Sequence, residues 1–391
     1  MLYVLLDILR SRLVDAGLYR FVMALDQTAF RAFAAAILAF AIVLAAGKPV
    51  VRWLAAKKIG DSARFDVAAL DRALASKANT PTMGGILIAG AIGLSTLLLA
   101  DVRDMYVVMA LIVLVWTAVV GGVDDWLKLT SASRGPGQRQ GLYAWEKLVF
   151  QLGLGFLIGW FVYKQGDATP GGPDLAHVLN LPFQRTYEPG AARLNPALIY
   201  LSRPVFIVVT MLMIAGLSNA VNITDGMDGL AAGVCAFVGA GVFVLALITG
   251  REFFAQYLLS PALPFTADLA IVAGAMVGAC LGFLWWNGSP AIVFMGDTGS
   301  LCLGGLIGYL AVALRQEALV LLMSGVLIVE LGSVALQVGY FRFSGGKRIL
   351  RCAPFHWHLH LGGWPEQKIV VRLWIVSMIL LALGLGSLKL R

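Results

Sequence analysis

Residues 219–230 read Asn219-Ala-Val-Asn222-Ile-Thr-Asp225-Gly-Met-Asp228-Gly-Leu230, a polar stretch between two apolar runs, each of about twenty residues, the length that crosses a bilayer. Amides and carboxylates beside membrane segments are costly unless they serve a site or protrude into water. The two glycines allow a sharp turn and a close approach to a ligand, and Leu230 predicts a helix start, whose free N–H groups can face an anion. The stretch therefore predicts a loop that holds a phosphate, a metal ion or both, unless it simply extends into water.

The composition places the chain among polytopic membrane proteins. Of its 391 residues, 59% are hydrophobic and 13% are charged, and its mean hydropathy of +0.83 is far above that of a soluble domain. The net charge of +8 suits loops that face anionic lipid headgroups, and it could also attract an anionic substrate. Nucleic acid is not an expected partner, because no dense basic stripe is present. The four cysteines form no close pair of the kind that ligates zinc, so we interpret them as packing residues.

Ten apolar segments are long enough to predict membrane helices. They are residues 32–47, 83–100, 105–123, 148–163, 196–217, 230–249, 269–286, 301–314, 318–338 and 373–388. We expect one all-α integral membrane domain over residues 1–391. Residues 1–27 are expected to form an interfacial helix and not a signal peptide, and residues 164–196 an external loop with a short hairpin.

The basic residues predict the orientation in the membrane. The loops after the first, third, fifth, seventh and ninth segments carry most of the Lys and Arg, which places these loops in the cytoplasm. Both termini then lie on the outer side of the membrane, which would be the periplasmic side in a bacterial inner membrane.

Unusual polar residues fall in all five of these cytoplasmic loops. The first loop contains Lys77 and ends near Thr82, the second opens with Asp124 and Asp125, the third is the stretch from Asn219 to Asp228, the fourth ends with Phe294 and Asp297, and the fifth contains His356 and His358. Clustering on one side, from distant parts of the chain, is what a single active site on the cytoplasmic loops would give.

Each of these residues could instead have an ordinary structural role. The alternatives are solvated charge for Asp124 and Asp125, a helix cap for Asp297 or Thr82, a surface cation for Lys77, and contact with lipid headgroups for His356 and His358. Those roles would have to coincide five times on one side, so a site is the better interpretation. A transporter is the non-enzyme alternative, but it predicts polar residues through the middle of several spans, and here they gather at the ends.

Carboxylates, lysines and helix N-termini at a membrane surface suit a magnesium-assisted reaction between phosphates. Mg²⁺ binds a few carboxylates together with phosphate oxygens, and it offsets the repulsion when one phosphate attacks another. Lys77, Lys128 and Lys147 could shield the remaining charge, and a free aspartate could accept a proton. The position at the bilayer predicts that one substrate is a lipid phosphate and the other is water-soluble.

The motifs carry a resemblance to the polyprenyl-phosphate sugar-phosphate transferases, and among them to the phospho-N-acetylmuramoyl-pentapeptide-transferases of peptidoglycan synthesis. The matching pieces are Lys77 with residues 80–85, then residues 121–125, 219–230, 293–300, 353–356 and 363–366. The resemblance implies a ten-span, usually dimeric enzyme of the inner membrane. Such an enzyme transfers phospho-MurNAc-pentapeptide from its UDP carrier to undecaprenyl phosphate, which gives lipid I and UMP. A transferase of UDP-N-acetylhexosamines is the alternative within the same family.

The resemblance also implies residue roles. Asp297 would be the main Mg²⁺ ligand, Asp124 the candidate base, and Asp125 an aid to the metal or the proton transfer. The nucleotide and diphosphate pocket would be lined by Lys77, Thr82, Lys128, Asn219, Asn222, Asp225 and Asp228, with Phe294 stacked on the uracil and with His356 and His358 near the sugar or phosphates.

The fifth loop departs from the family pattern. Trp357 stands where the family usually has the second of three histidines, and His360 stands where it has an acid. These changes leave the metal carboxylates intact, and they affect the contacts expected from the fifth loop.

Overall fold

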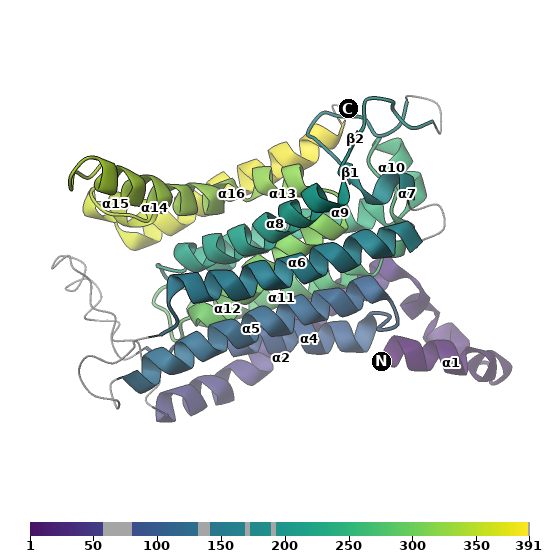
Figure 1. Ribbon diagram of the computed structural model, residues 1–391. Helices are drawn as coiled ribbons and strands as arrows, with labels where there is room; N and C mark the ends of the chain where they lie inside the picture. The colour runs from purple at the N-terminus through teal and green to yellow at the C-terminus, as the bar shows by residue number, and fades with distance from the viewer. Residues whose placement is uncertain (58–79, 132–140, 169–172, 189–192, 390–391) are drawn as a thin grey trace.

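The computed structural model describes residues 1–57, 80–131, 141–168, 173–188 and 193–389 (Figure 1). Lys77 lies outside these ranges. The long helices are α2 (Thr28–Ala56), α4 (Gly85–Leu99), α5 (Met105–Ser131), α6 (Ala144–Ala168), α8 (Arg203–Thr224), α9 (Leu230–Thr249), α11 (Leu269–Asn287), α12 (Gly296–Ala313), α14 (Gly325–Phe343) and α16 (Glu366–Lys389). The short helices are α1 (Leu2–Asp15), α7 (Pro173–Ala176), α10 (Glu252–Tyr257), α13 (Glu317–Met323) and α15 (Phe355–Leu361), with 3₁₀ turns at Tyr19–Phe21, Met23–Asp26 and Pro264–Thr266.

The expected all-α polytopic membrane fold is confirmed. Within the described ranges, nine helices are long and apolar enough to cross a membrane, and α4 is a shorter apolar helix. Each of the ten predicted segments overlaps one of these ten helices. Figure 1 shows the helices running roughly side by side, with both chain termini at one end of the bundle and α15 at the other.

The prediction of a continuous helix over residues 318–338 is wrong. Ser324 is not helical and separates α13 from α14. Its N–H donates to the Val320 carbonyl at 2.8 Å and its carbonyl accepts the Ile328 N–H at 3.0 Å, so the chain can bend here without losing these hydrogen bonds. Tight packing accompanies the bend, because a Cβ added at Gly325 would lie 2.8 Å from the Leu380 side chain of α16.

Helix α12 lies at the centre of the bundle, and all but the first of its residues are buried. It packs against α5 on one side and α8 on another, while α11 packs against α2 and α9. The α2–α11 contact relies on small residues, since Gly274 and Gly278 meet the backbone of Ala32 and Ala36 so closely that a Cβ at either glycine would overlap it. Close approach at small residues is a common basis of helix association in membranes.

The short sheet lies in the connections at the end of the bundle that holds both chain termini (Figure 1). Strands β1 (Val178–Leu179) and β2 (Ile199–Tyr200) pair antiparallel, with Val178 opposite Tyr200, and an isolated bridge joins Tyr187 to Leu194. The expected helix at the N-terminus is present as α1, followed by two 3₁₀ turns over Tyr19–Phe21 and Met23–Asp26.

Candidate active site

Three buried carboxylates from two helices meet at the end of the bundle where α12 begins. Asp124 and Asp125 lie on α5 and Asp297 lies in the first turn of α12, and their oxygens come within 4.8 Å of one another. The expectation that Asp124 and Asp125 open a loop is wrong, because α5 continues to Ser131. Gly121 allows the approach, since a Cβ there would overlap the Asp297 carbonyl of α12.

Asp125 caps helix α12 from across the helix interface. Its Oδ1 accepts the Asp297 N–H at 3.0 Å, and its Oδ2 accepts the Thr298 N–H at 2.9 Å and the Thr298 hydroxyl at 2.7 Å. The first N–H groups of a helix have no partner within the helix and favour a negative charge. The cap suggested for Asp297 is therefore supplied by Asp125, and the carboxylate of Asp297 is left to face the site.

Two lysines bridge the other two carboxylates. Lys128 Nζ lies 2.7 Å from Asp124 Oδ2 and 3.1 Å from Asp297 Oδ1. Lys147 at the start of α6 contacts the same Asp124 oxygen at 2.7 Å and also pairs with Asp297. The Leu142 N–H donates to Asp124 Oδ1 at 2.7 Å. Carboxylate charge at the site is thus balanced by two ammonium groups that could turn to an anionic ligand.

The carboxylate cluster fits a divalent cation. It offers hard oxygen donors from three side chains within the reach of one ion, and Mg²⁺ prefers such oxygens, completed by water or phosphate. The residues predicted as metal ligands could therefore hold a metal ion together.

The segment that contains Thr82 pairs with the segment before α12. The Phe294 N–H donates to the Pro81 carbonyl, and the Gly84 N–H donates to the Phe294 carbonyl, both at 2.8 Å. Thr82 is held close to the cluster, since a Cβ added at Gly296 would lie 3.0 Å from its hydroxyl and 2.8 Å from Asp125 Oδ2. Phe294 is partly exposed at the edge of the site.

The opening polar stretch forms the end of α8 and the turn into α9. Asn219 donates to Gln151 Oε1 of α6 at 2.6 Å and Asn222 donates to Ser300 Oγ of α12 at 2.9 Å, so both amides hold neighbouring helices together. They lie on α8 and not in the loop that we expected. The predicted helix start at Leu230 is confirmed.

Asp225 and Asp228 differ in their surroundings. Burial, followed by the negative charges of Asp297 and Asp125, raises the pKa of Asp225 to about 8, and the Gly296 N–H opposes this shift. The Asp228 carboxylate accepts the Ala291 N–H at 3.0 Å, and its own N–H donates to Glu366 Oε1 at 2.9 Å. Asp225 therefore interacts electrostatically with the carboxylate cluster, whereas Asp228 connects its own turn to the Ala291 loop and to Glu366 at the start of α16.

The two histidines lie in α15, not in an irregular loop. His356 is fully buried, and its Nδ1 lies 3.0 Å from Glu330 Oε2 of α14, while its Nε2 lies against Gly226 of the polar stretch. His358 accepts the Arg351 N–H at its Nδ1 at 3.1 Å. Glu330 thus holds the imidazole that reaches the site, and the His358 contact stays within the connection between α14 and α15.

The two unusual residues of α15 serve packing. Trp357 is buried, with the His360 ring edge-on at 5.6 Å. His360 Nδ1 lies 3.1 Å from the Trp364 carbonyl, within the turn that follows α15.

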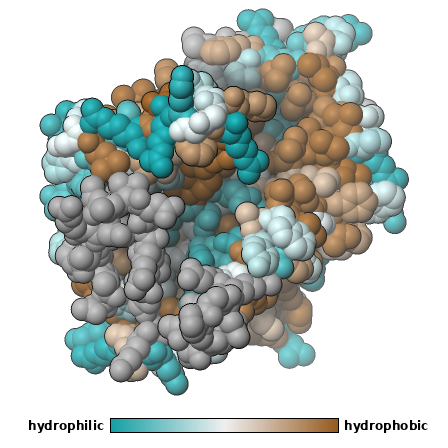
Figure 2. All heavy atoms as spheres, turned by 60° about the vertical axis from the view of Figure 1, so that its left-hand side comes forward, coloured by the Kyte–Doolittle hydropathy of each residue, from teal (hydrophilic) through white to brown (hydrophobic). Residues whose placement is uncertain are grey.

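The structure brings together the carboxylates, Thr82, Lys128, the polar stretch, Phe294 and His356, and it adds partners that sequence reasoning missed. These are Leu142 through its N–H, Gln151, Asn287, Thr298 and Ser300. Lys147, which we expected only to shield charge, pairs with Asp124 and Asp297, and Glu330 contacts His356. Their signal in the sequence is weak because each acts through a partner far away in the chain. Figure 2 shows this end of the molecule, with hydrophilic surface in a hollow beside a hydrophobic flank.

Comparison with protein families agrees with this geometry. Residues 106–315, more than half of the chain, match the model of glycosyl transferase family 4. Residues 77–88, which run from the first loop into α4, match phospho-N-acetylmuramoyl-pentapeptide-transferase signature 1. The matched ranges contain all three carboxylates, both bridging lysines and Thr82. The chain is therefore a multi-pass membrane phospho-sugar transferase that belongs to glycosyl transferase family 4 and carries the signature of the phospho-N-acetylmuramoyl-pentapeptide-transferases.

Proposed function

We propose that the protein transfers phospho-MurNAc-pentapeptide from UDP-MurNAc-pentapeptide to undecaprenyl phosphate, and so makes lipid I and UMP for peptidoglycan synthesis. The observation that carries this proposal is the cluster of Asp124, Asp125 and Asp297 bridged by two lysines, next to the segment that matches the signature. The same resemblance supports a homodimer in the bacterial inner membrane, with the site facing the cytoplasm.

In this reaction, an oxygen of the lipid phosphate attacks the phosphorus that carries the sugar. The bond from that phosphorus to the bridging oxygen of the uridine phosphate breaks, and UMP leaves with this oxygen and its negative charge. Mg²⁺ held by Asp297, Asp124 and Asp125 would offset the repulsion between the reacting phosphates. Lys128 and Lys147, which now pair with the carboxylates, can then turn to the phosphate oxygens and shield their charge.

The structure supports different roles for the two adjacent aspartates. Besides its place in the proposed metal site, Asp125 uses both oxygens to cap α12 and so positions Asp297. Asp124 binds the two lysines and the Leu142 N–H, so its carboxylate faces the two ammonium groups of the site. Asp124 is therefore the better candidate to accept the proton of the lipid phosphate, which then passes to solvent.

The other predicted contacts fall around this centre. Thr82, Asp225 and Phe294 border the cluster, and the His356 ring reaches Gly226 in the polar stretch. Asn219, Asn222 and Asp228 hold the walls of the pocket through their partners in other helices and loops. Lys77 and His358 remain predictions for the nucleotide and sugar, and Phe294 remains the predicted stacking partner of the uracil.

The test is release of UMP by the purified protein given UDP-MurNAc-pentapeptide, undecaprenyl phosphate and Mg²⁺. We expect release that needs both the lipid and the metal, and that a chelator stops. Asp297→Asn is expected to abolish turnover because it weakens the metal site. Release only with UDP-N-acetylhexosamines would assign the protein to the alternative transferases, and near-normal activity of Asp297→Asn at limiting Mg²⁺ would contradict the metal site.

A further inference from the structure

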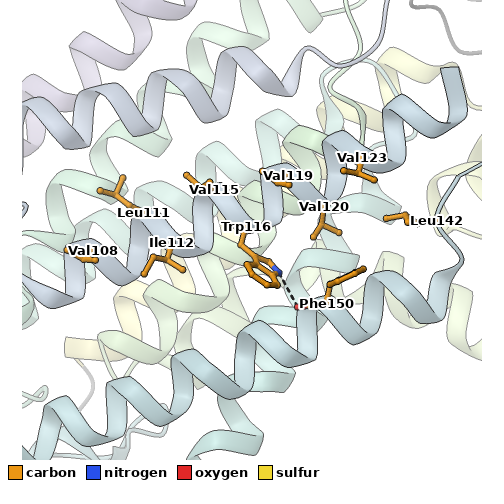
Figure 3. Close-up of a pocket in the computed structure, with 10 residues that line it drawn as sticks. All are labelled: Val108, Leu111, Ile112, Val115, Trp116, Val119, Val120, Val123, Leu142 and Phe150. Carbon is orange, nitrogen blue, oxygen red and sulfur yellow. Dashed lines mark hydrogen bonds between the residues drawn. The ribbon is translucent and has the colours of Figure 1, made fainter. Parts of the chain in front are cut away.

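Two pockets along α5 differ in the chemistry of their walls. The larger one, of about 680 Å³, lies between α5 and α6 and is lined by hydrophobic residues (Figure 3), and the Trp116 ring N–H there donates to the Phe150 carbonyl at 3.2 Å. The smaller one, of about 340 Å³, is lined by Tyr3, Arg31, Asp101, Asp104 and Asp268, together with apolar residues of the turn before α11. Carboxylates and a guanidinium face the smaller pocket, so it can recognise a charged ligand.

The smaller pocket lies at the end of the bundle that holds both chain termini (Figure 1). Its walls come from α1, α2 and the turns before α5 and α11. Asp104 directly precedes α5, and Asp124 of the carboxylate cluster lies further along the same helix, about 30 Å away by the rise of an α-helix. The smaller pocket is therefore separate from the candidate active site.

Arg31 is paired within the wall of this pocket. Its side chain is 3% exposed, its Nη1 and Nη2 donate to the two Asp268 oxygens at 2.9 and 3.0 Å, and its guanidinium lies 3.8 Å from the centre of the Tyr3 ring. The Nε–H of Arg31 is buried and has no acceptor in the described part of the chain. The pair with Asp268 is thus neutral overall, and it leaves one buried donor for a ligand.

The two aspartates of the turn before α5 differ in their partners. Asp101 accepts hydrogen bonds from Arg103 at 2.9 and 2.8 Å. Asp104 accepts the Tyr106 N–H at 2.9 Å, and no basic side chain among the described residues pairs with it. Burial, followed by the charges of Asp268 and Asp101, raises the pKa of Asp104 to about 6, against the effect of the Tyr106 N–H. Asp104 is therefore the carboxylate of this pocket with which a cation can pair.

The surroundings place the pocket at the level of lipid headgroups. α5 and α11 begin at this pocket, and both are long enough to cross the bilayer, so their ends meet its headgroup region. Leu2, Leu5 and Ile8 of α1 are exposed and are spaced by three residues, so they form an apolar face next to the pocket. A lipid with a positively charged headgroup atom is therefore the ligand most available to Asp104.

We infer that this pocket binds the headgroup of phosphatidylethanolamine, with the ammonium group at Asp104 and a headgroup oxygen at the Arg31 Nε–H. The carboxylates of the lining outnumber its guanidinium, which disfavours an anionic lipid such as phosphatidylglycerol. The choline group of phosphatidylcholine has no N–H to donate. A bare metal ion fits less well, because among the described residues the acids within reach of one ion are those of the active-site cluster.

Binding can be tested on the purified full-length protein in nanodiscs of phosphatidylcholine. A trace of phosphatidylethanolamine with a photoreactive group beside its headgroup would be cross-linked, and the labelled peptides identified. We expect labels on peptides that contain residues 101–104 or 264–268, removed by added unlabelled phosphatidylethanolamine and not by an equal amount of phosphatidylglycerol. Labels elsewhere, equal competition by phosphatidylglycerol, or removal by Mg²⁺ alone would overturn the inference.

Asp104→Asn tests the charge and keeps the local structure, because asparagine caps a helix as well as aspartate does. We expect labelling of the pocket to fall at least about tenfold, as for the loss of a hydrogen bond to a charged group. Asp167→Asn is the matched control, since Asp167 lies at the same end of the bundle on α6, its side chain is 57% exposed, and it does not line the pocket. Unchanged labelling of Asp104→Asn, or equal losses in both variants, would overturn the inference.

The wild-type protein provides a second readout through pH. The other charged or titratable groups near Asp104 are Asp101, Asp268, Arg31, Arg103, Tyr3 and the N-terminal amine. The hydrogen bond from Arg103 lowers the pKa of Asp101, so Asp101 keeps its charge where Asp104 titrates. Labelling should be constant above about pH 6 and fall below it, by up to tenfold per pH unit, as Asp104 is protonated.

Labelling that persists well below pH 6 would contradict the role of Asp104. Neither readout depends on turnover, so the inference is tested independently of the proposed function.

Discussion

Asp124 and Asp125 are neighbours in the sequence, yet their carboxylates have different partners. Asp125 accepts three hydrogen bonds from the first turn of α12, and Asp124 pairs with two lysines. Consecutive helical residues point about 100° apart, so one can face the neighbouring helix while the other faces the site. A pair of acids that looks like a single motif thus separates into a helix cap and a carboxylate that pairs with two lysines.

The cap predicts a specific effect of Thr298. Its buried hydroxyl donates to Asp125 at 2.7 Å, and Thr298→Val keeps the shape while removing this donor. Hydrogen bonds to charged groups contribute about 1.5–3 kcal/mol, so the free energy of unfolding should fall by that amount, and turnover should fall because Asp297 is less well held. Thr298→Ser keeps the donor and should lose only about 0.8 kcal/mol for one methyl group. Unfolding in detergent, together with UMP release, checks both, and a valine variant as active as the serine variant would exclude the positioning role.

Asp225 predicts that metal binding depends on pH. With its pKa raised to about 8, the carboxyl group is mostly protonated at neutral pH. A cation nearby favours the ionised form, so below pH 8 cation binding must release this proton. Affinity for Mg²⁺ should therefore increase with pH, by up to tenfold per pH unit, and level off above about 8.

Titration of Mg²⁺ binding by calorimetry over about two pH units on either side of 8 would measure this effect. Asp225→Asn is the control, because it removes the titrating carboxyl group. The affinity for Mg²⁺ should then no longer rise with pH below about 8. An unchanged profile in this variant would assign the dependence to another group.

At the residue scale, the sequence showed which side chains are chemically unusual but not what they contact. Asp297 and Asp125 were both recognised, and the choice between cap and ligand was open because it depends on how α5 and α12 meet. The contact of Glu330 with His356 was likewise hidden, since twenty-six residues separate the pair. Such assignments require the packing of helices, which local patterns do not contain.

Among the elements, the contact between α5 and α12 depends on Gly121, and the neighbouring Gly122 provides a matched control. A Cβ at Gly121 would overlap the Asp297 carbonyl, whereas a Cβ at Gly122 would lie 3.6 Å from the Thr298 hydroxyl, an ordinary contact. Gly121→Ala should therefore shift the start of α12 and lower turnover by more than about tenfold, equivalent to 1.4 kcal/mol. Gly122→Ala should retain most activity. The test is a comparison of kcat for the two alanine variants. Equal values would show that the close approach at Gly121 does not position α12.

The spans themselves were accessible from the sequence because hydrophobic length alone identifies a helix that crosses a membrane. The ends of the membrane helices were harder to predict from the sequence. Helix α5 continues beyond the predicted segment, which ended at Val123, and includes Asp124, Asp125 and Lys128, since a helix that leaves the membrane can remain helical with polar residues. The division at Ser324 was also missed, because an apolar run gives no sign of where a helix is interrupted within it.

For the whole molecule, the orientation in the membrane can be read from a native cysteine. Cys352 lies outside the membrane helices and is partly exposed, whereas Cys235, Cys280 and Cys302 are fully buried. A maleimide that cannot cross membranes should label Cys352 in inverted vesicles and not in intact cells, because we expect this connection to be cytoplasmic. Burial raises the pKa of the thiol, so labelling should be slow at neutral pH and accelerate as the pH rises. Cys352→Ser should remove the label, and labelling of intact cells would reverse the topology.

The carboxylate cluster lies at the end of a bundle of membrane-spanning helices, and this position has a consequence for how the protein meets a lipid acceptor. A substrate that arrives within the bilayer is sampled by diffusion in two dimensions, and its effective concentration is a mole fraction among lipids, not an amount per volume of solution. Adding inert phospholipid at constant acceptor would then slow the reaction by surface dilution, while adding buffer would not. The rate of transfer would in this way report how much free acceptor lipid the membrane contains.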